Sequence, residues 1–576
     1  MTDQDIGYLN TLSPDEAYQF ILRERPKQAA WKFLLDFQPG QKGLVLEGRA
    51  GSVSIELSKH YREIILIQDN ADIVSNITHR AASLEVNNMT VICSASVLGI
   101  PFAQSTFDCV IIHDIGARLP GQGESSATLF PLLLEAKRVL KADGTLLVTG
   151  DNNSLFIRIR SELKRLKAFV MGNPVRQRRL GRKRPAKALC SPPAQGFHQV
   201  EGMIREAGFQ HRNLFAITPC LIPFEEVTRI KKSGHMSRLK QWVSPAFAII
   251  ATQKTAPDSF LNRFSKAVFG PLGGEEMTRY ISGNPDSVML IYKTREGGAV
   301  IRLPLTSVSL ARCQKNLDTL HALSKKQTVL SGRIPRVIDR GTFEGQPYFI
   351  ESLIAGSVIR SDKTASLNRV VHEAASLLTR FHQETIERRM IDKKEFSRIA
   401  SPFISGVLPY IQEDAQSAFR YIVDFVQDRL LGRELPLVFS HGDFQADNIL
   451  VNPDNCSIQG LIDWDLAGDA ALPLLDLLYL FLYTEEMTGQ GDFKYIFLRQ
   501  FCPLHLNNDV MASFEQYRTA LGIASDQTLP LIIFFWLHHV AFRTERAGRQ
   551  LNGWMNQFFY PILSKIYETV QREKDA

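Results

Sequence analysis

The chain has 576 residues, which is too long for one hydrophobic core and suits two folded units. Its 44% hydrophobic and 22% charged residues, with a formal net charge of +7, exclude a fibrous or intrinsically disordered chain. Seven scattered cysteines without a Cys-x-x-Cys pair argue against a disulfide or zinc framework and, with an acidic start that lacks a secretory profile, predict a cytoplasmic protein.

The first half opens with a strand, a glycine turn, a helix and a second strand. The apolar run 43–46 leads through Glu47 into a turn that contains Gly48 and Gly51, and the second apolar run ends at Asp69. Such a turn lets the backbone approach a nucleotide, and an acid about twenty residues later can accept hydrogen bonds from ribose hydroxyls. This order predicts a nucleotide-binding α/β domain.

Later segments of this half resemble class I S-adenosylmethionine-dependent methyltransferases. Residues 99–112 match the Leu-Pro-Phe…Phe-Asp segment that leads into their fourth strand, and residues 135–148 match their next helix, turn and fifth strand. The segments 203–209 and 246–251 are similar to their closing elements. The resemblance covers about residues 30–255 and implies a Rossmann-like α/β fold.

The glycine turn carries the cofactor site that this resemblance implies. The residues that would contact S-adenosylmethionine are Glu47, Gly48, Gly51 and Asp69. Arg49 and Val53 stand near positions where active members carry glycine. Two alternatives stay open. The domain either binds the cofactor and transfers a methyl group by positioning the acceptor against the sulfonium, or it is a degenerate scaffold of that fold.

A basic insertion at about 154–190 follows the fifth predicted strand. Twelve Lys or Arg residues lie between Arg158 and Lys187, opposed only by Glu162, and the first part has the apolar spacing of an amphipathic helix. Three interpretations remain: a solvated insertion packed on the domain, contact of residues 154–187 with an anionic membrane surface, or contact with a phosphate-bearing glycan, lipid or nucleic acid. With few aromatics and no recognisable binding module, no nucleic-acid partner is predicted.

The second half begins after a candidate linker at 255–258, so we place the domain boundary after residue 256. Residues 287–303 predict two strands joined by a Gly-containing turn at 294–298. The apolar runs 472–483 and 529–542 are too short and too interrupted to span a bilayer, and they predict core helices.

Two polar motifs follow apolar strands in this half. His441 and Gly442 precede Asp443, Asn448 stands five positions later, and Asp463 follows a second apolar run. A phosphoryl-transfer site needs one carboxylate to orient the acceptor hydroxyl, and an amide oxygen and a second carboxylate to hold Mg²⁺. Plain turn residues at strand ends are the alternative, but three such roles rarely coincide at this spacing.

These motifs resemble the aminoglycoside phosphotransferase and choline kinase-like family, in which His-Gly-Asp and Asp-Trp replace the His-Arg-Asp and Asp-Phe-Gly of protein kinases. The resemblance covers about residues 260–560. It implies an α+β bilobal kinase-like fold, with an N-lobe at about 260–354 and a C-lobe at about 355–576. It also implies ATP and Mg²⁺ as cofactors.

The resemblance implies a role for each matching residue. Asp443 would orient the acceptor hydroxyl and accept its proton, while Asn448 and Asp463 would hold Mg²⁺. Arg302 would contact nucleotide phosphate in place of the more usual Lys. Backbone groups around Glu351 and Leu353 would meet the adenine.

Further residues are expected to support this site. Asp476 matches an acid that braces the C-lobe, His441 would brace the catalytic loop by hydrogen bonding, and Asp465 would support the metal site from outside it. His382 is expected to be a packed structural histidine.

Two features depart from the family pattern. No Gly-rich phosphate loop is recognisable, because the glycines of 269–274 lie too far ahead of the predicted hairpin. The helix expected to supply a Glu partner for Arg302 carries Cys313 or Gln314 at that place, which implies weak nucleotide binding or a different brace.

The sequence therefore predicts a methyltransferase-like domain at 1–256 and a kinase domain at 257–576. The predicted function is transfer of phosphate from ATP to a hydroxyl of a small molecule or glycan, fused to a candidate methyltransferase in a bifunctional protein. The alternative is a non-catalytic scaffold that docks on the inner face of the membrane, or on a partner, through its basic helix. Neither the acceptor nor the oligomeric state has a recognisable code in the sequence.

Overall fold

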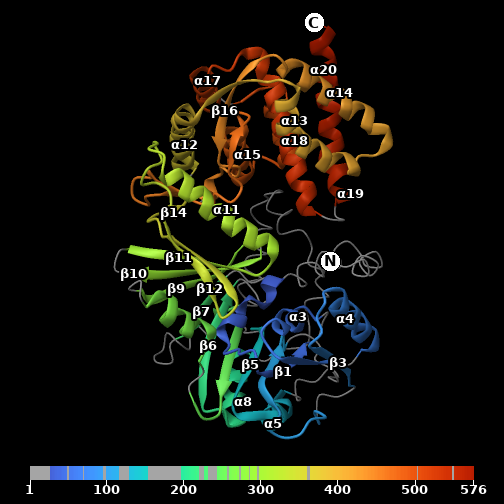
Figure 1. Ribbon diagram of the computed structural model, residues 1–576, viewed down its shortest axis with the longest axis vertical. Helices are drawn as coiled ribbons and strands as arrows, with labels where there is room; N and C mark the ends of the chain where they lie inside the picture. Colours follow the sequence, from blue (N-terminus) through green and yellow to red (C-terminus); the bar gives the residue numbers. More distant parts are fainter. Residues whose placement is uncertain are drawn as a thin grey trace, which may run out of the picture. The chain divides into compact units, whose positions relative to one another are not determined.

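The computed structural model divides the chain into two compact units (Figure 1). The first comprises residues 1–311 and 339–350, and the second comprises residues 312–338 and 351–576. The residues that the structure describes are 26–47, 51–68, 70–94, 99–115, 129–152, 196–218, 226–230, 243–255, 258–270, 274–283, 286–294, 297–359, 364–502, 504–506, 508–547 and 551–575. The predicted boundary after residue 256 lies within the first unit. This predicted boundary separates two types of fold rather than the two compact units, and it stays a prediction.

The methyltransferase-like part is a sheet with the strand order β3-β2-β1-β4-β5-β8-β6. The strands are β1 (Lys42–Glu47), β2 (Glu63–Gln68), β3 (Met89–Cys93), β4 (Phe107–His113), β5 (Leu140–Asp151), β6 (His211–Thr218) and β8 (Ala246–Thr252). Strands β1 to β5 pair in parallel, and β8 runs antiparallel to both β5 and β6. This order, with one reversed strand near the edge, is that of a Rossmann-like methyltransferase fold, so the predicted fold class is confirmed here.

Helices cover both faces of this sheet. They are η1 (Pro26–Leu34), α3 (Ser52–Ser58), α4 (Ala71–Ser83), α5 (Leu129–Val139) and α8 (Phe197–Glu206). Alternate residues of β1 point to opposite faces, because successive side chains of a strand do so. Val45 packs into a core with η1 and α3, whereas Leu44 and Leu46 pack into a second core with α5 and α8. A strand buried on both faces is typical of a parallel sheet.

The kinase-like N-lobe supplies the strand order β12-β13-β11-β10-β9 and one long helix. The elements are β9 (Gly274–Gly283), β10 (Ser287–Thr294), β11 (Gly297–Pro304), α11 (Ser307–Ser324), β12 (Val337–Phe343) and β13 (Gln346–Ser352). Strands β10 and β11 form the predicted hairpin, in which Met289 pairs with Arg302. The order and the helix after β11 are those of a protein-kinase N-lobe, which confirms the second predicted fold.

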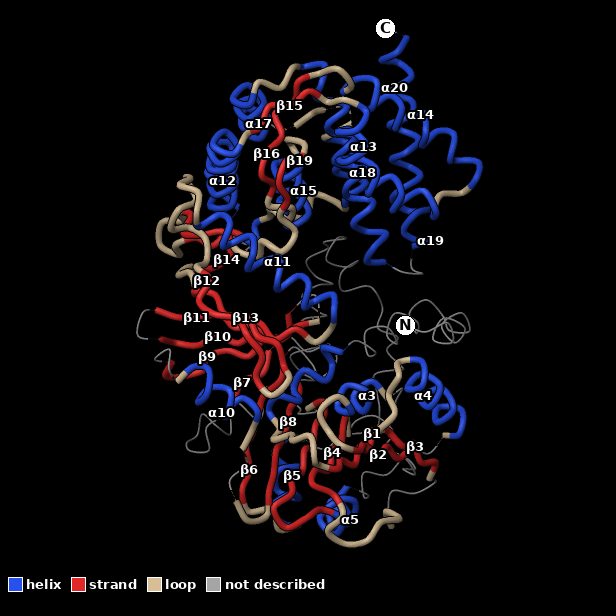
Figure 2. The backbone as a smooth tube through the Cα atoms, viewed as in Figure 1, coloured by secondary structure: helices blue, strands red, loops and turns tan. Residues whose placement is uncertain are grey.

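The sheet of the methyltransferase-like part and the sheet of the N-lobe are continuous. Strand β7 (Glu226–Ile230) pairs antiparallel with β6 on one side and with β9 on the other, where Val227 lies opposite Tyr280. Thirteen strands therefore form a single sheet, and Figures 1 and 2 show β7 between β6 and β9. Strand β7 pairs with the edge that β6 would otherwise expose. The methyltransferase-like part and the N-lobe are therefore not two separate domains joined by a linker.

A layer of aromatic rings joins the two parts of the first unit. Phe260 opens α10 (Phe260–Phe264), and α10 continues into the π-helical η3 (Ser265–Phe269). The ring of Phe260 lies 5.2 Å from that of Phe37 and 5.4 Å from that of Phe343 on β12. The segment that follows the candidate linker at 255–258 is thus embedded in the core.

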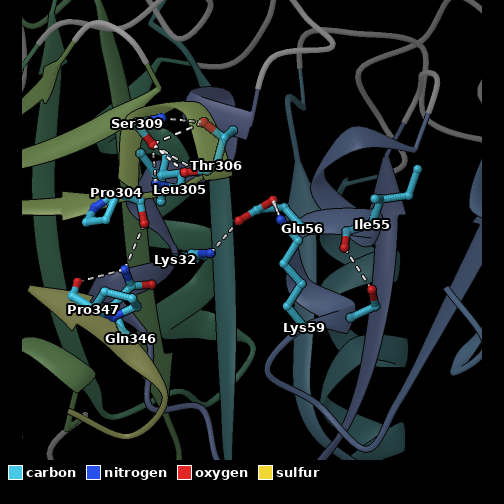
Figure 3. A network of polar contacts seen from close by, with 12 residues as sticks. Lys32, Ile55, Glu56, Lys59, Pro304, Leu305, Thr306, Ser309, Gln346 and Pro347 are labelled. Atoms are coloured by element: carbon cyan, nitrogen blue, oxygen red, sulfur yellow. Dashed lines mark hydrogen bonds and ion pairs between the residues drawn. The ribbon is translucent and has the colours of Figure 1, made fainter. Parts of the chain in front are cut away.

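A buried ion pair lies in the same region (Figure 3). Nζ of Lys32 on η1 lies 2.6 Å from Oε1 of Glu56 on α3, and both side chains are almost fully buried. Burial lowers the pKa of Lys32, while the Glu56 carboxylate acts in the opposite direction. The hydroxyl of Tyr280 on β9 donates to the carbonyl of Ala30 on the same helix. Helix η1 is therefore tied both to α3 and to the N-lobe strands.

The second unit contains the C-lobe, in which helices surround short strands (Figure 2). Its helices are α12 (Thr364–Thr385), α13 (Lys393–Val407), η4 (Leu408–Tyr410), α14 (Glu413–Leu430), η5 (Ala446–Asn448), α15 (Leu475–Thr488), α16 (Phe493–Gln500), α17 (Asn508–Leu521), α18 (Ser525–Ala547), α19 (Leu551–Trp554), η7 (Met555–Phe559) and α20 (Tyr560–Asp575). Its strands are β14 (Ser357–Val358), β15 (Glu387–Met390), β16 (Glu434–Ser440), β17 (Ile449–Val451), β18 (Ile458–Leu461) and β19 (Gly468–Ala471). Helix α15 covers the predicted apolar run from residue 475 on and α18 contains the other run, and most of their described residues are buried.

In the described part of the chain, no single helix has the length and apolar character needed to cross a membrane. The pair Val510–Leu521 and Ser525–Thr544 meets the same criteria together but is bent by 110°.

We predict that Phe260→Ala loosens both parts of the first unit together, because the ring packs against residues from each. Loss of a buried Phe side chain is expected to cost about 3–5 kcal/mol. Hydrogen exchange of the full chain should therefore speed up in β1 and β2 and also in β10 and β11. Val308→Ala, at a position that is 59% exposed, is the control and should change neither. A change confined to one pair of strands would contradict a shared cooperative core.

Candidate active site

The side chain of Asp443 is held by two amides. Asp443 follows β16, and the Gln445 amide donates to its Oδ1 at 3.0 Å. Asn448 Nδ2 donates to Oδ2 of Asp443 at 3.2 Å and to its backbone carbonyl at 2.8 Å. Burial raises the pKa of Asp443, and the negative charge of Asp463 raises it further, while His441 and the two amides act in the opposite direction. The carboxylate is therefore fixed in orientation and more basic than a solvated Asp.

The β17–β18 hairpin brings Asn448 and Asp463 together. Ile449 pairs with Leu461, so Asn448 and Ile462 lie at the same end of the hairpin. The Ile462 amide donates to the Asn448 carbonyl at 3.1 Å. The next residue, Asp463, has a φ of 70°. A non-glycine residue in this left-handed region is strained, and such residues cluster at functional sites.

Asp476 anchors the loop that carries Asp443. Its carboxylate, on the first turn of α15, accepts from the hydroxyl of Ser440 at 3.0 Å and from the backbone amides of His441 at 2.7 Å and Gly442 at 2.9 Å. Nε2 of His382 lies 3.5 Å from the same carboxylate. Burial alone would raise the pKa of Asp476, but His382, His441 and these hydrogen bonds outweigh it and hold the pKa below its usual value.

The loop itself requires glycine at one position. Gly442 has a φ of 82°, and a Cβ atom there would lie 2.3 Å from the Leu466 carbonyl oxygen. The neighbouring His441 places Nε2 3.1 Å from the Ile462 carbonyl, which links the catalytic loop to the loop of Asp463. His441 thus bridges the two loops as a brace would, and His382 is buried and bonded to the hydroxyl of Tyr517, as a packed structural histidine would be.

The residues with implied nucleotide contacts lie in two places. Glu351 and Leu353 belong to the second unit, at and just after the end of β13. Glu351 is buried, whereas Leu353 is 40% exposed and offers an apolar surface. Arg302 lies on β11 in the first unit.

Within the second unit, the structure gathers Asp443, Asn448 and Asp463 at one site.

Two features of this site were missed in the sequence. The first is strand β9, which was not predicted and which pairs antiparallel with β10 ahead of the predicted hairpin. Residues 265–269, in contrast, belong to η3.

The second missed feature lies on α11. Of the two residues expected at the place of a Glu, Cys313 is buried and Gln314 donates to Asp318 on its own helix. It is instead Arg312 and Asn316 that reach the loop of Asp463. Their spacing of four residues puts both on one helix face, a signal that the sequence did contain.

The implied cofactor turn of the first unit is partly described. Glu47 is buried at the end of β1, where its carboxylate accepts from the hydroxyl of Ser54 at 2.7 Å and from the Ser54 amide at 3.2 Å. Burial raises the pKa of Glu47 to about 7. Gly51 has a φ of 79°, which favours glycine. Gly48, Arg49, Asp69 and the basic insertion at 154–190 lie outside the described residues, so the predicted membrane contact of 154–187 stays a prediction.

The chain therefore combines a kinase-like fold in its second half with a methyltransferase-like fold in its first half. The model of the phosphotransferase enzyme family (APH) matches residues 277–513, which confirms the resemblance of the second half. No curated protein matches the chain.

Solved structures resemble each half. A thermostable mutant of aminoglycoside phosphotransferase APH(4)-Ia is 16% identical with a TM-score of 0.36, over 54% of this chain and 98% of that one. Aminoglycoside phosphotransferase APH(3'')-Id from Streptomyces rimosus is 19% identical with a TM-score of 0.31, over 49% and 97%. A SAM dependent methyltransferase from Aquifex aeolicus is 15% identical with a TM-score of 0.26, over 42% and 96%.

We predict that Asp476→Asn lowers the stability of the second unit at neutral pH and weakens its acid dependence. The pKa of Asp476 is depressed in the folded state, so its stabilisation is present above the unfolded-state pKa of about 3.9 and is lost as the pH falls through the folded-state value. Losing charged hydrogen bonds should cost about 2 kcal/mol or more at pH 7. Urea unfolding of the full chain between pH 7 and pH 3 measures both effects.

Asp454→Asn is the matched control, since it makes the same charge change at an exposed turn. The curves of wild type and Asp454→Asn should run together, and that of Asp476→Asn should lie lower and flatter. Three parallel curves would show that the Asp476 carboxylate does not anchor the loop.

Proposed function

We propose that this protein is an ATP- and Mg²⁺-dependent phosphotransferase that acts on a hydroxyl group of a small molecule or glycan. The observation that carries the proposal is the convergence of Asp443, Asn448 and Asp463 at one end of the β17–β18 hairpin, with Asn448 bonded directly to Asp443. One carboxylate for the acceptor, with an amide and a second carboxylate for a metal, is the group set that phosphoryl transfer requires.

Asp443 would receive the acceptor hydroxyl. Its raised pKa suits a group that accepts a hydrogen bond and then a proton from an alcohol during transfer. The amides of Gln445 and Asn448 fix its rotamer, so the acceptor oxygen would be held in line with the phosphate by a preorganised group.

Asn448 and Asp463 fit a hard divalent cation, which prefers carboxylate and amide oxygens. The Asn448 amide nitrogen faces Asp443, which turns its amide oxygen the other way. When bound, Mg²⁺ would neutralise charge on the transferred phosphate.

The nucleotide would be held by the remaining residues. Arg302, on β11, would contact phosphate with its planar guanidinium. The apolar Leu353 and the backbone near Glu351 would meet the adenine.

We predict that Asp443→Asn reduces ATP-dependent phosphorylation by roughly 10²- to 10⁴-fold, the usual range for loss of a general base. The assay is ATP turnover by the full chain with and without a panel of hydroxyl-bearing acceptors, among them sugars, amino alcohols and glycans. Asp454→Asn, at an exposed turn of the same lobe, should keep the wild-type rate. Equal turnover by wild type and Asp443→Asn would contradict the assignment, and a protein that does not bind Mg²⁺-ATP would favour the non-catalytic scaffold.

We also propose that the first unit binds S-adenosylmethionine. The strand order β3-β2-β1-β4-β5-β8-β6 and the left-handed Gly51 at the start of α3 support this second proposal. The Glu47 carboxylate accepts hydrogen bonds from Ser54, which argues against a cofactor site of the usual methyltransferase form. A methyltransferase and a kinase in one chain would then modify acceptors that carry both kinds of group.

Calorimetric titration of S-adenosylmethionine into the full chain tests this second proposal. We expect micromolar binding that Asp69→Ala weakens at least tenfold, because loss of a charged hydrogen bond costs about 1.5–3 kcal/mol. The full chain is required, since a fragment cut after residue 256 would lose the partner strand β9 and the Phe260 ring. Absence of binding at millimolar cofactor would leave a degenerate methyltransferase fold.

A further inference from the structure

Asn316 on α11 joins two parts of the second unit that lie far apart in the sequence. Its Nδ2 donates to Oε2 of Glu351 at 2.7 Å, and its Oδ1 accepts from the backbone amide of Trp464 at 2.9 Å. Asn316 is only 1% exposed, and Glu351 is 4% exposed. A buried amide bonded on both sides has one orientation, because turning it over would lose both hydrogen bonds.

The amide that Asn316 holds directly follows the proposed metal ligand. Asp463 has a φ of 70°, a strained conformation that persists only where its surroundings enforce it. The surroundings do so through Trp464. Its indole Nε1 donates to the Leu461 carbonyl at 3.2 Å, and its ring lies 4.4 Å from that of His441. With the bond to Asn316, both the backbone and the side chain of Trp464 are fixed.

A second contact from the same helix face supports this arrangement. Arg312 lies one turn before Asn316 and places Nη1 3.4 Å from Oδ2 of Asp465. The helix α11 therefore contacts two successive residues after Asp463, one through a neutral amide and one through an ion pair. Helix α11 and the loop of Asp463 are thereby held in register.

We propose that Asn316 is a positioning residue that couples the adenine-contacting strand end at Glu351 to the metal-binding conformation of Asp463. This inference rests on the proposed phosphotransferase function. Asn316 would act through its hydrogen bonds to Glu351 and Trp464 rather than by touching nucleotide or acceptor itself. In this chain a neutral amide therefore braces the loop of Asp463, whereas the family pattern predicts a carboxylate on the same helix.

The central test is a complementary pair of substitutions. Asn316→Asp keeps an oxygen for the Trp464 amide but places a second carboxylate against Glu351. We expect kcat/KM for Mg²⁺-ATP to fall roughly 10- to 100-fold, the scale of a small misplacement of catalytic groups. Adding Glu351→Gln restores a hydrogen-bond donor between the two positions, because the side-chain amide at position 351 can then donate to the carboxylate at position 316. The double variant should therefore recover most of the lost activity.

Gln314→Ala is the matched control, since Gln314 lies on the same helix but bonds to Asp318 at the surface. Its kcat/KM should equal that of wild type. Wild-type kinetics in Asn316→Asp, or a double variant no better than the single one, would overturn the inference. A merely structural role would lower the melting temperature of Asn316→Asp without changing kcat/KM below the transition, and that outcome too would overturn it.

Hydrogen exchange of a peptide covering 461–466 separates this inference from the proposed function. Exchange at the Trp464 amide should speed up at least tenfold in Asn316→Ala and stay unchanged in Gln314→Ala, whether or not the protein turns over ATP. If exchange responds in this way but wild type shows no phosphotransfer, the bracing contact stands and the proposed activity fails. If exchange does not respond, Asn316 does not hold the loop and the inference fails.

Discussion

The pairing of β7 with both β6 and β9 is the constraint on which the first unit depends. An open sheet ends in a row of unpaired amides and carbonyls, which a stable protein must cover. In this chain the edge of the methyltransferase-like sheet is covered by β7, and the far side of β7 is covered by the first N-lobe strand. The N-lobe is therefore a continuation of the methyltransferase-like sheet, with a shared aromatic core beneath it.

This continuity gives the first half a structural role that is independent of any methyl transfer. The N-lobe strands bury residues such as Leu290 and Tyr280 in the same core as Phe33 and Phe37. If the cofactor turn were inactive, the methyltransferase-like fold would still be needed to complete that core. A degenerate cofactor site and a retained fold are thus compatible, because selection on stability acts on packing while selection on catalysis acts on the site.

The fold types could be predicted from the sequence, because each depends on local patterns of apolar strands and on polar motifs at strand ends. Asp443, Asn448 and Asp463 could be identified for the same reason, since their spacing along the chain reflects one hairpin. The joining of the two sheets could not be predicted, because β7 has only five residues, its burial does not alternate, and its partner strands lie about 10 and 50 residues away along the chain. Asn316 could not be predicted because the family pattern indicates a carboxylate at another position of this helix, and only the three-dimensional contacts show which side chain of α11 reaches Trp464.

A neutral amide at Asn316 is physically reasonable in such a buried place. Taking a charged pair out of water costs free energy that mutual attraction often fails to recover, whereas a fully bonded amide avoids most of that cost. Glu351 already brings one negative charge to this region, so a carboxylate at position 316 would place a second one within hydrogen-bonding distance of it. The asparagine amide donates to Glu351 and accepts from Trp464 at once, and it does so with a short side chain. The brace between helix, strand end and metal loop is therefore achieved by directional hydrogen bonds rather than by charge.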